Sequence, residues 1–131
     1  DQYFAWYNLG TSYINLQDYA SAAQAYDQSF LIYAGLPDNN QRPFRMVWYQ
    51  TGPYFAYYYS GRYQDVLDLA NNTFATIQER LVLEESLYWR GMAKVALGDI
   101  PGAEADFRKS LEIHPDFSPT LEAMRNLGLE P

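Results

Sequence analysis

The side chains that most often carry out catalysis are scarce in this sequence. The chain has no cysteine and a single histidine, His114, in the run Glu112, Ile113, His114, Pro115. Because proline commonly follows the end of a helix, this histidine is expected on the surface at a helix terminus. No cluster has the spacing of metal ligands, no Gly-rich phosphate loop is present, and no nucleophile has a paired base. We therefore expect neither an enzyme, nor a metal site, nor a cofactor.

Aromatic side chains are instead abundant. They make up 18% of the 131 residues and include 13 tyrosines. A ring brings a large apolar area with few rotatable bonds, and tyrosine adds a hydroxyl that can hydrogen-bond a peptide carbonyl. Packing between helices explains any single ring better, so only a cluster of them indicates an interface. The chemistry that the composition favours is the recognition of another polypeptide.

Charge and hydropathy exclude two other classes of partner. The formal net charge is −7, and no cluster of Lys and Arg is present to bind phosphates, so we expect no nucleic-acid binding. No run of 18 apolar residues occurs, so we expect no membrane insertion. The 48% hydrophobic content suffices for one core, which predicts a single domain over residues 1–131. A cysteine-free chain suits a reducing or an oxidising compartment, and localisation stays open.

Helical periodicity and capping residues indicate the elements. Apolar residues recur at spacings of three and four from Tyr19 to Tyr33 and again from Val66 to Ile77. Asp18 and Asp99 each precede an expected helix, where a carboxylate can accept hydrogen bonds from free backbone N–H groups.

The last element is expected to begin at Ser118 and Pro119, with Ser118 as the N-cap and Pro119 in the first helical position. Its apolar stripe is expected to cover the open face of the preceding helices.

A repeated pattern joins these helices into pairs. The first copy, of the form W-x2-L-G-x2-Y then A-x3-F with Tyr in place of Phe, consists of Trp6, Leu9, Gly10, Tyr13, Ala22 and Tyr26. The last copy consists of Arg90, Gly91, Leu97, Gly98, Asp99, Ala103, Phe107 and Pro115. A degenerate middle copy is marked by Gly61, Arg62, Tyr63, Val66 and Ala70. These patterns resemble the tetratricopeptide-repeat (TPR) family.

The resemblance implies an all-α fold, an α-α superhelix or TPR solenoid of three helical-hairpin repeats plus a C-terminal capping helix. The expected boundaries are about 3–36 for repeat 1, about 37–43 for an inserted loop, about 44–80 for repeat 2, about 84–117 for repeat 3 and about 118–128 for the capping helix. Gly52 and Pro53 fall inside an expected helix, which either kinks there or starts late, and they leave the register of the middle repeat open.

Small residues are expected where the helices of a pair approach, with bulky side chains filling the space beside them. The small residues are Gly10, Ala22, Gly91 and Ala103, and the bulky ones are Trp6, Tyr26 and Phe107.

In this family the first helices of successive repeats line a concave face that holds peptides or helices. The resemblance therefore implies a non-catalytic protein–protein interaction module that binds a peptide or protein segment in an aromatic concave groove. The residues expected there are Tyr7, Asn8, Thr11, Asn15, Trp48, Phe55, Tyr58, Tyr59, Tyr88, Trp89 and Met92. Arg90 and Lys94 lie on the same expected helix as the last three, and for them a solvated or ion-paired role is expected.

A second resemblance gives an alternative. The segments 36–37, 45–50, 52–54, 61–63 and 88–91 are similar to the repeat region of bacterial proteins that carry a bacteriocin-processing-type, papain-like cysteine peptidase-like domain. None of that domain's Cys or His motif is present, so no peptidase activity is implied. The alternative function is an intramolecular accessory domain of a larger bacterial protein. The first repeat lacks an N-terminal cap, which predicts either an upstream domain in the same parent chain or self-association through that repeat.

Overall fold

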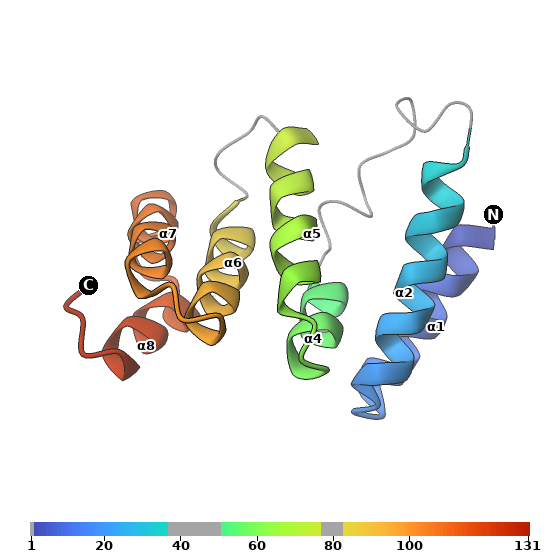
Figure 1. The fold of residues 1–131 in the computed structure, drawn as a ribbon, viewed down its shortest axis with the longest axis horizontal. Coiled ribbons are helices and arrows are strands. Elements are labelled where there is room, and N and C mark those ends of the chain that lie inside the picture. The colour runs from blue at the N-terminus through green and yellow to red at the C-terminus, as the bar shows by residue number, and fades with distance from the viewer. Residues whose placement is uncertain (1, 37–50, 77–82) are drawn as a thin grey trace. The chain divides into compact units, whose positions relative to one another are not determined.

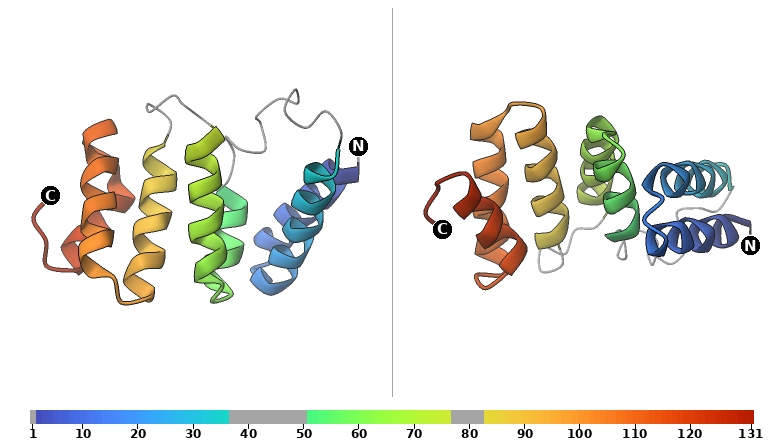
Figure 2. Two further views of the ribbon diagram at one scale, coloured as in Figure 1. Left: turned by 45° about the horizontal axis from the view of Figure 1, so that its top comes forward. Right: turned by 90° about the horizontal axis from the view of Figure 1, so that it is seen from below.

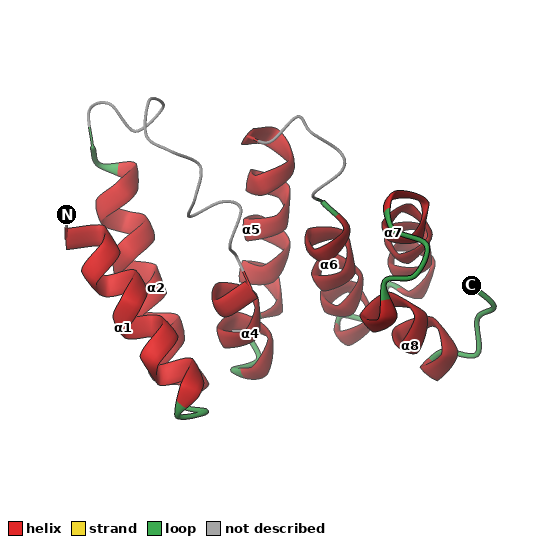
Figure 3. Ribbon diagram, turned by 180° about the vertical axis from the view of Figure 1, so that it is seen from behind, coloured by secondary structure: helices red, strands yellow, loops and turns green. Residues whose placement is uncertain are grey.

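The computed structural model describes residues 2–36, 51–76 and 83–131, and over these residues it is helical without strands (Figures 1 and 3). Its helices are α1 (Gln2–Asn15), α2 (Tyr19–Ala34), α4 (Thr51–Tyr59), α5 (Tyr63–Thr76), α6 (Glu84–Ala96), α7 (Ile100–Ile113) and α8 (Ser118–Asn126). The prediction of an all-α fold built from helical hairpins is confirmed. The expected inserted loop at 37–43 and the predicted site residue Trp48 lie outside the described residues.

The chain divides into two compact units, residues 1–62 and residues 63–131. The described helices of the first unit are α1, α2 and α4, and those of the second are α5, α6, α7 and α8. Each unit is described by itself below. Within the described ranges, no helix combines the length and the apolar character needed to cross a membrane.

The hairpin turns are built alike, and the predicted caps are confirmed. The Asp18 carboxylate accepts a hydrogen bond from the Ser21 N–H at 3.1 Å, and the Asp99 carboxylate accepts one from the Gly102 N–H at 3.0 Å. One residue earlier in each turn the backbone is left-handed, with φ of 59° at Gln17 and 88° at Gly98. Each turn therefore caps the second helix and reverses the chain within three residues.

The turn after α4 has the same geometry and fixes the register of the middle repeat. Gly61 has φ of 79°, and the Arg62 N–H donates to the Tyr57 carbonyl at 2.8 Å. In the first hairpin the matching bond runs from Asp18 to Tyr13 at 3.0 Å, so the offset between the two turns is 44 residues. This offset places Tyr54 at the position of Gly10. Pro53 lies within the described part of α4 and is buried.

The close contact between paired helices, which we call the seam, is also repeated at an offset of 81 residues. A Cβ added to Gly10 would lie 2.7 Å from the Tyr26 ring, and one added to Gly91 would lie 2.5 Å from the Phe107 ring. Both glycines are therefore required for the rings to pack against the facing helix. The expectation for Tyr26 and Phe107 is confirmed by this packing and by their complete burial.

Trp6 was also expected to fill the space between the paired helices, but it is 38% exposed.

In each hairpin, one equivalent hydrogen bond joins the two helices at the end away from the turn. The Ser29 hydroxyl donates to the Tyr3 carbonyl at 2.6 Å, and the Ser110 hydroxyl donates to the Glu84 carbonyl at 3.0 Å. Both serines are fully buried, so each hydroxyl satisfies a carbonyl in the first turn of the facing helix. The hairpins α1–α2 and α6–α7 thus share their turn, seam and far-end bond.

In the second unit, α5 packs against α6 and α8 packs against α6 and α7 (Figure 2). Met124 of α8 is fully buried in a cluster with Ala103, Phe107 and Ala123. The predicted final helix is therefore present and covers the α6–α7 hairpin. Its start differs by one residue from the prediction, because Phe117 is the N-cap and Ser118 is already helical.

Candidate protein-binding surfaces

A cluster of aromatic side chains with one exposed member, Tyr59, lies on the first unit. Tyr59, at the end of α4, is 53% exposed, and its ring centroid lies 5.2 Å from Tyr58, 5.5 Å from Phe55 and 5.2 Å from Tyr19 of α2. We call these four residues the aromatic cluster. Three of them were predicted site residues, and the structure brings them together because they share one side of α4 near the start of α2. Tyr19 was predicted only as a helix residue.

The predicted site residues of α1 combine a packed ring with exposed polar groups. Tyr7 is half-buried, with its ring 5.0 Å from Tyr26 and 6.5 Å from Phe30. The Thr11 hydroxyl shares a hydrogen bond with the Tyr26 hydroxyl at 3.0 Å. Burial raises the pKa of Tyr26, and the Thr11 bond partly offsets this rise. Asn8, Thr11 and Asn15 are exposed, so α1 offers amides and a hydroxyl to solvent.

The predicted site residues of the third repeat are less accessible. Trp89 is only 4% exposed, and its indole N–H donates to the Glu85 carboxylate at 3.4 Å. It therefore lies in the core of the second unit and differs from the exposed anchor that the resemblance implied. Tyr88 and Met92 are half-buried and pack against the Phe107 cluster.

An ion pair that the sequence reasoning missed holds α4 to α2. The Asp27 carboxylate accepts hydrogen bonds from both terminal nitrogens of Arg62, at 2.8 and 2.9 Å, and from the Tyr57 hydroxyl at 2.9 Å. The Arg62 guanidinium also lies over the Tyr57 ring, 4.7 Å from its centroid. These contacts position the end of α4, and with it Tyr58 and Tyr59. Asp27 and Arg62 are 35 residues apart, and no local pattern indicated their pairing.

The second unit holds a buried carboxylate between two cations. Asp106 is 2% exposed and accepts a two-point contact from Arg90, at 2.7 and 2.9 Å, and an ion pair from Lys94 at 2.9 Å. The ion-paired role expected for Arg90 and Lys94 is confirmed. Arg90 also donates to the Asn71 side chain at 2.9 Å and lies over the Phe74 ring at 4.6 Å, so it links α6 to α5.

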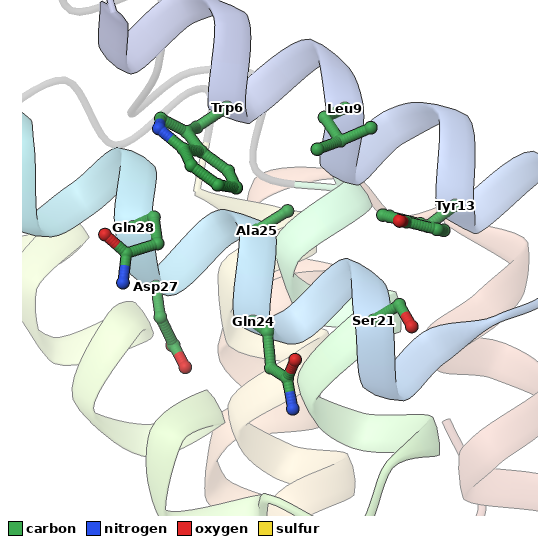
Figure 4. A pocket seen from close by; sticks show the side chains of 8 residues that line it. All are labelled: Trp6, Leu9, Tyr13, Ser21, Gln24, Ala25, Asp27 and Gln28. Atoms are coloured by element: carbon green, nitrogen blue, oxygen red, sulfur yellow. The ribbon is translucent and has the colours of Figure 1, made fainter.

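A pocket of about 380 Å³ opens between α1 and α2 (Figure 4). Trp6, Leu9 and Tyr13 line it from α1, and α2 contributes Ser21, Gln24, Ala25, Asp27 and Gln28. We call it the Trp6 pocket. The first three residues belong to the repeat pattern, and the sequence reasoning treated Trp6 only as a packing residue. Their spacing cannot show whether a neighbouring helix covers them.

No metal-binding group of three His, Cys, Asp or Glu side chains occurs among the described residues. His114 caps the C-terminus of α7 and is exposed, with Nδ1 4.0 Å from the Glu84 carboxylate. This position agrees with the expected surface location at a helix end.

Comparison with known proteins supports the repeat pattern. A family model described as tetratricopeptide repeat matches residues 5–34 and 84–117, which hold the hairpins α1–α2 and α6–α7. Over 82 residues, 60% of this chain, the sequence is 33% identical to the RNA polymerase-associated protein CTR9 of Saccharomyces cerevisiae. The match spans only 7% of the length of that relative.

Repeats of this all-helical type are generally non-catalytic scaffolds, and they imply a module that interacts with protein partners. The hairpin geometry, the repeated seam and the family model agree. Both hairpins, at residues 5–34 and 84–117, are thus similar to tetratricopeptide repeats.

Proposed function

We propose that this chain binds a peptide or protein segment of a partner through the aromatic cluster and the exposed polar residues of α1. The observation that carries the proposal is Tyr59, which is 53% exposed while its ring contacts three neighbouring rings. A ring that is already packed loses little conformational freedom when it binds, so its apolar area contributes more fully to affinity.

The polar groups of α1 complement these rings. Asn8 and Asn15 are exposed, and an amide can donate to and accept from the backbone of an extended segment. Neither α1 nor α4 contains an acidic or a basic residue. The bound segment is therefore expected to be apolar or to contain proline, and its affinity is expected to depend little on salt.

The groove residues predicted on α6 belong to the second unit and stay a separate prediction. Tyr88 and Met92 are half-buried, and Trp89 is buried, so we assign the main contacts to the first unit. The chaperone-tail mode is not expected, because the matching positions Tyr7 and Thr11 lack the lysine that would bind a terminal carboxylate.

The test is selection of binding peptides from a displayed random library, followed by calorimetry with the purified chain. Tyr59→Ala and Asn8→Ala are each expected to weaken the selected peptides at least about tenfold, or about 1.4 kcal/mol. Lys109→Ala, at an exposed position of α7, is the matched control and should leave affinity unchanged. Peptides whose affinity is insensitive to both first-unit substitutions would reject the aromatic surface as the site.

The alternative function is an accessory domain of a larger bacterial protein with a cysteine peptidase-like domain. In CTR9 the stretch similar to this chain is 7% of the protein, so in that relative it is a small part of a long chain. A neighbouring domain that covers the aromatic cluster would block peptide binding in the parent protein. Equal affinity of one selected peptide for the parent and for residues 1–131 would argue against this alternative.

A further inference from the structure

The exposed hydroxyl of Thr11 belongs to a short chain of hydrogen bonds within the first unit. Tyr26 of α2 is fully buried, and its hydroxyl lies 3.0 Å from Thr11 Oγ1. A Cβ added to Gly52 of α4 would collide with the same hydroxyl, so the α4 backbone closes that side. Among the residues that the structure describes, Thr11 is therefore the hydrogen-bond partner of the Tyr26 hydroxyl.

The direction of each bond follows from what the groups can do. A carbonyl oxygen only accepts, so the Thr11 hydroxyl donates its hydrogen to the Tyr7 carbonyl, at 3.2 Å. Burial raises the pKa of Tyr26, so its phenol keeps its proton at neutral pH. A buried donor without an acceptor is costly, and Tyr26 therefore donates to Thr11. Turning the Thr11 hydrogen to solvent would leave two oxygens facing each other with no hydrogen between them.

Thr11 consequently faces solvent as a hydrogen-bond acceptor. A hydroxyl oxygen has two lone pairs, and Tyr26 occupies one of them. Thr11 is exposed, so the second lone pair is accessible to a ligand. Tyr26 stands where the repeat pattern has Phe, which has no hydroxyl. This chain of hydrogen bonds is thus a feature of the present sequence rather than of the repeat pattern.

We propose that Thr11 determines specificity in the binding surface by accepting a hydrogen bond from a backbone N–H of the bound segment. The residue that supplies this N–H is not proline, whose backbone nitrogen carries no hydrogen. The inference rests on the proposed function and narrows its ligand. Proline is accommodated at the aromatic cluster and excluded opposite Thr11.

The spacing of polar residues on α1 favours an extended segment as the ligand. Thr11 and Asn15 are four residues apart, or about 6 Å along the helix axis, and both are exposed. An extended chain presents N–H and C=O groups on one side at every second residue, about 6.7 Å apart. Asn15 is therefore placed to bond the residue two positions away from the one at Thr11. A helical ligand would offer Thr11 no donor along its length, because its backbone N–H groups are bonded internally.

The test replaces each backbone N–H of a library-selected peptide, one position at a time, by an ester oxygen. At one position the ester should weaken binding at least about tenfold, because it removes a donor and turns an oxygen toward Thr11. An ester also weakens the neighbouring carbonyl as an acceptor. Each loss is therefore compared with the loss measured on a variant without the hydroxyl.

That variant combines Thr11→Val with Tyr26→Phe. Deleting both hydroxyls avoids leaving a buried phenol unpaired, and a melting temperature close to that of the parent chain confirms the fold. The tenfold loss should fall to about twofold or less on the double variant, while the losses at other positions stay unchanged. Thr11→Ser keeps a hydroxyl and is the matched control, on which the tenfold loss should persist.

A second selection from the same library tests the exclusion of proline directly. Peptides selected on the parent chain should lack proline at the position that the ester scan identifies. Peptides selected on the double variant should accept proline there. Proline at that position in peptides selected on the parent chain would overturn the proposal.

The hydrogen bonds can also be measured without a ligand. The Tyr26 hydroxyl proton is expected as a slowly exchanging NMR signal near the Thr11 methyl group, and Thr11→Val should speed its exchange. Exchange as fast as that of a short tyrosine peptide would overturn the assigned direction.

The outcomes separate this inference from the proposed function. Peptides that respond to Tyr59→Ala but show equal ester losses on the parent chain and the double variant would overturn the role of Thr11 alone. Failure to select any peptide that responds to Tyr59→Ala would reject the proposed function and this inference together.

Discussion

The three hairpin turns each contain one left-handed residue, but its type differs between them. Gly61 and Gly98 adopt the left-handed conformation with φ of 79° and 88°, but the first turn places Gln17 there with φ of 59°. A residue with a Cβ meets steric strain in this region, whereas glycine does not. The first turn therefore stores strain that the other two avoid.

Gln17→Gly is expected to stabilise the chain by about 0.5–1 kcal/mol, since relief of the strain exceeds the entropy that glycine adds to the unfolded state. Urea denaturation followed by circular dichroism measures the change. Gly98→Gln is the matched control and should destabilise by about 1 kcal/mol, because a Cβ there has open space and only the backbone conformation opposes it. Equal stability of Gln17→Gly and the parent chain would show that the left-handed turn is not strained.

At the scale of elements, equivalent helices use different chemistry at three matching positions. In the second unit α6 and α7 are joined by Arg90, Lys94 and Asp106, while the first unit has Leu9, Tyr13 and Ala25 in their places. A buried ion pair is costly to break on one side only, and its replacement by apolar residues of similar shape is often neutral. The stability of the second unit should therefore depend on Asp106 only while Arg90 and Lys94 are present beside it.

Asp106→Ala is expected to lower the free energy of unfolding by about 2–3 kcal/mol, because Arg90 and Lys94 would lose their shared counter-ion. The triple substitution Arg90→Leu, Lys94→Tyr and Asp106→Ala should remain within about 1 kcal/mol of the parent chain. Chemical denaturation of both variants gives the comparison. A triple variant as unstable as Asp106→Ala would mean that α5 requires its contacts with Arg90.

The elements were predictable where the determinants are local. Asp18 and Asp99 stand directly before the helices they cap, and Tyr26 and Phe107 follow their small partners in a repeated pattern, so periodicity and spacing sufficed. The accessibility of Trp89 and Trp6 was not predictable, because a helical stripe looks the same whether or not another helix covers it. The pairing of Asp27 with Arg62 was out of reach for the same reason, since it depends on how α4 packs against α2.

At the scale of the whole molecule, charge is distributed unevenly. Residues 1–62 contain four acidic and three basic residues, whereas residues 63–131 contain twelve acidic and six basic ones. The acidic excess therefore lies in the second unit, and the proposed binding surface lies in the nearly neutral first one. This surface needs no electrostatic attraction, which fits recognition by rings and amides.

The division into two units predicts that the second one folds alone. Residues 63–131 contain their own buried cluster around Phe107 and Met124, and the ion pairs of Asp106 are internal to them. A domain of this size is marginal but can fold when its core is complete. The isolated fragment is expected to be helical and to unfold cooperatively on heating, as measured by circular dichroism, and Phe107→Ala should abolish the transition because it removes about 3–5 kcal/mol. A fragment that melts without a transition would show that the second unit needs residues 1–62 for its stability.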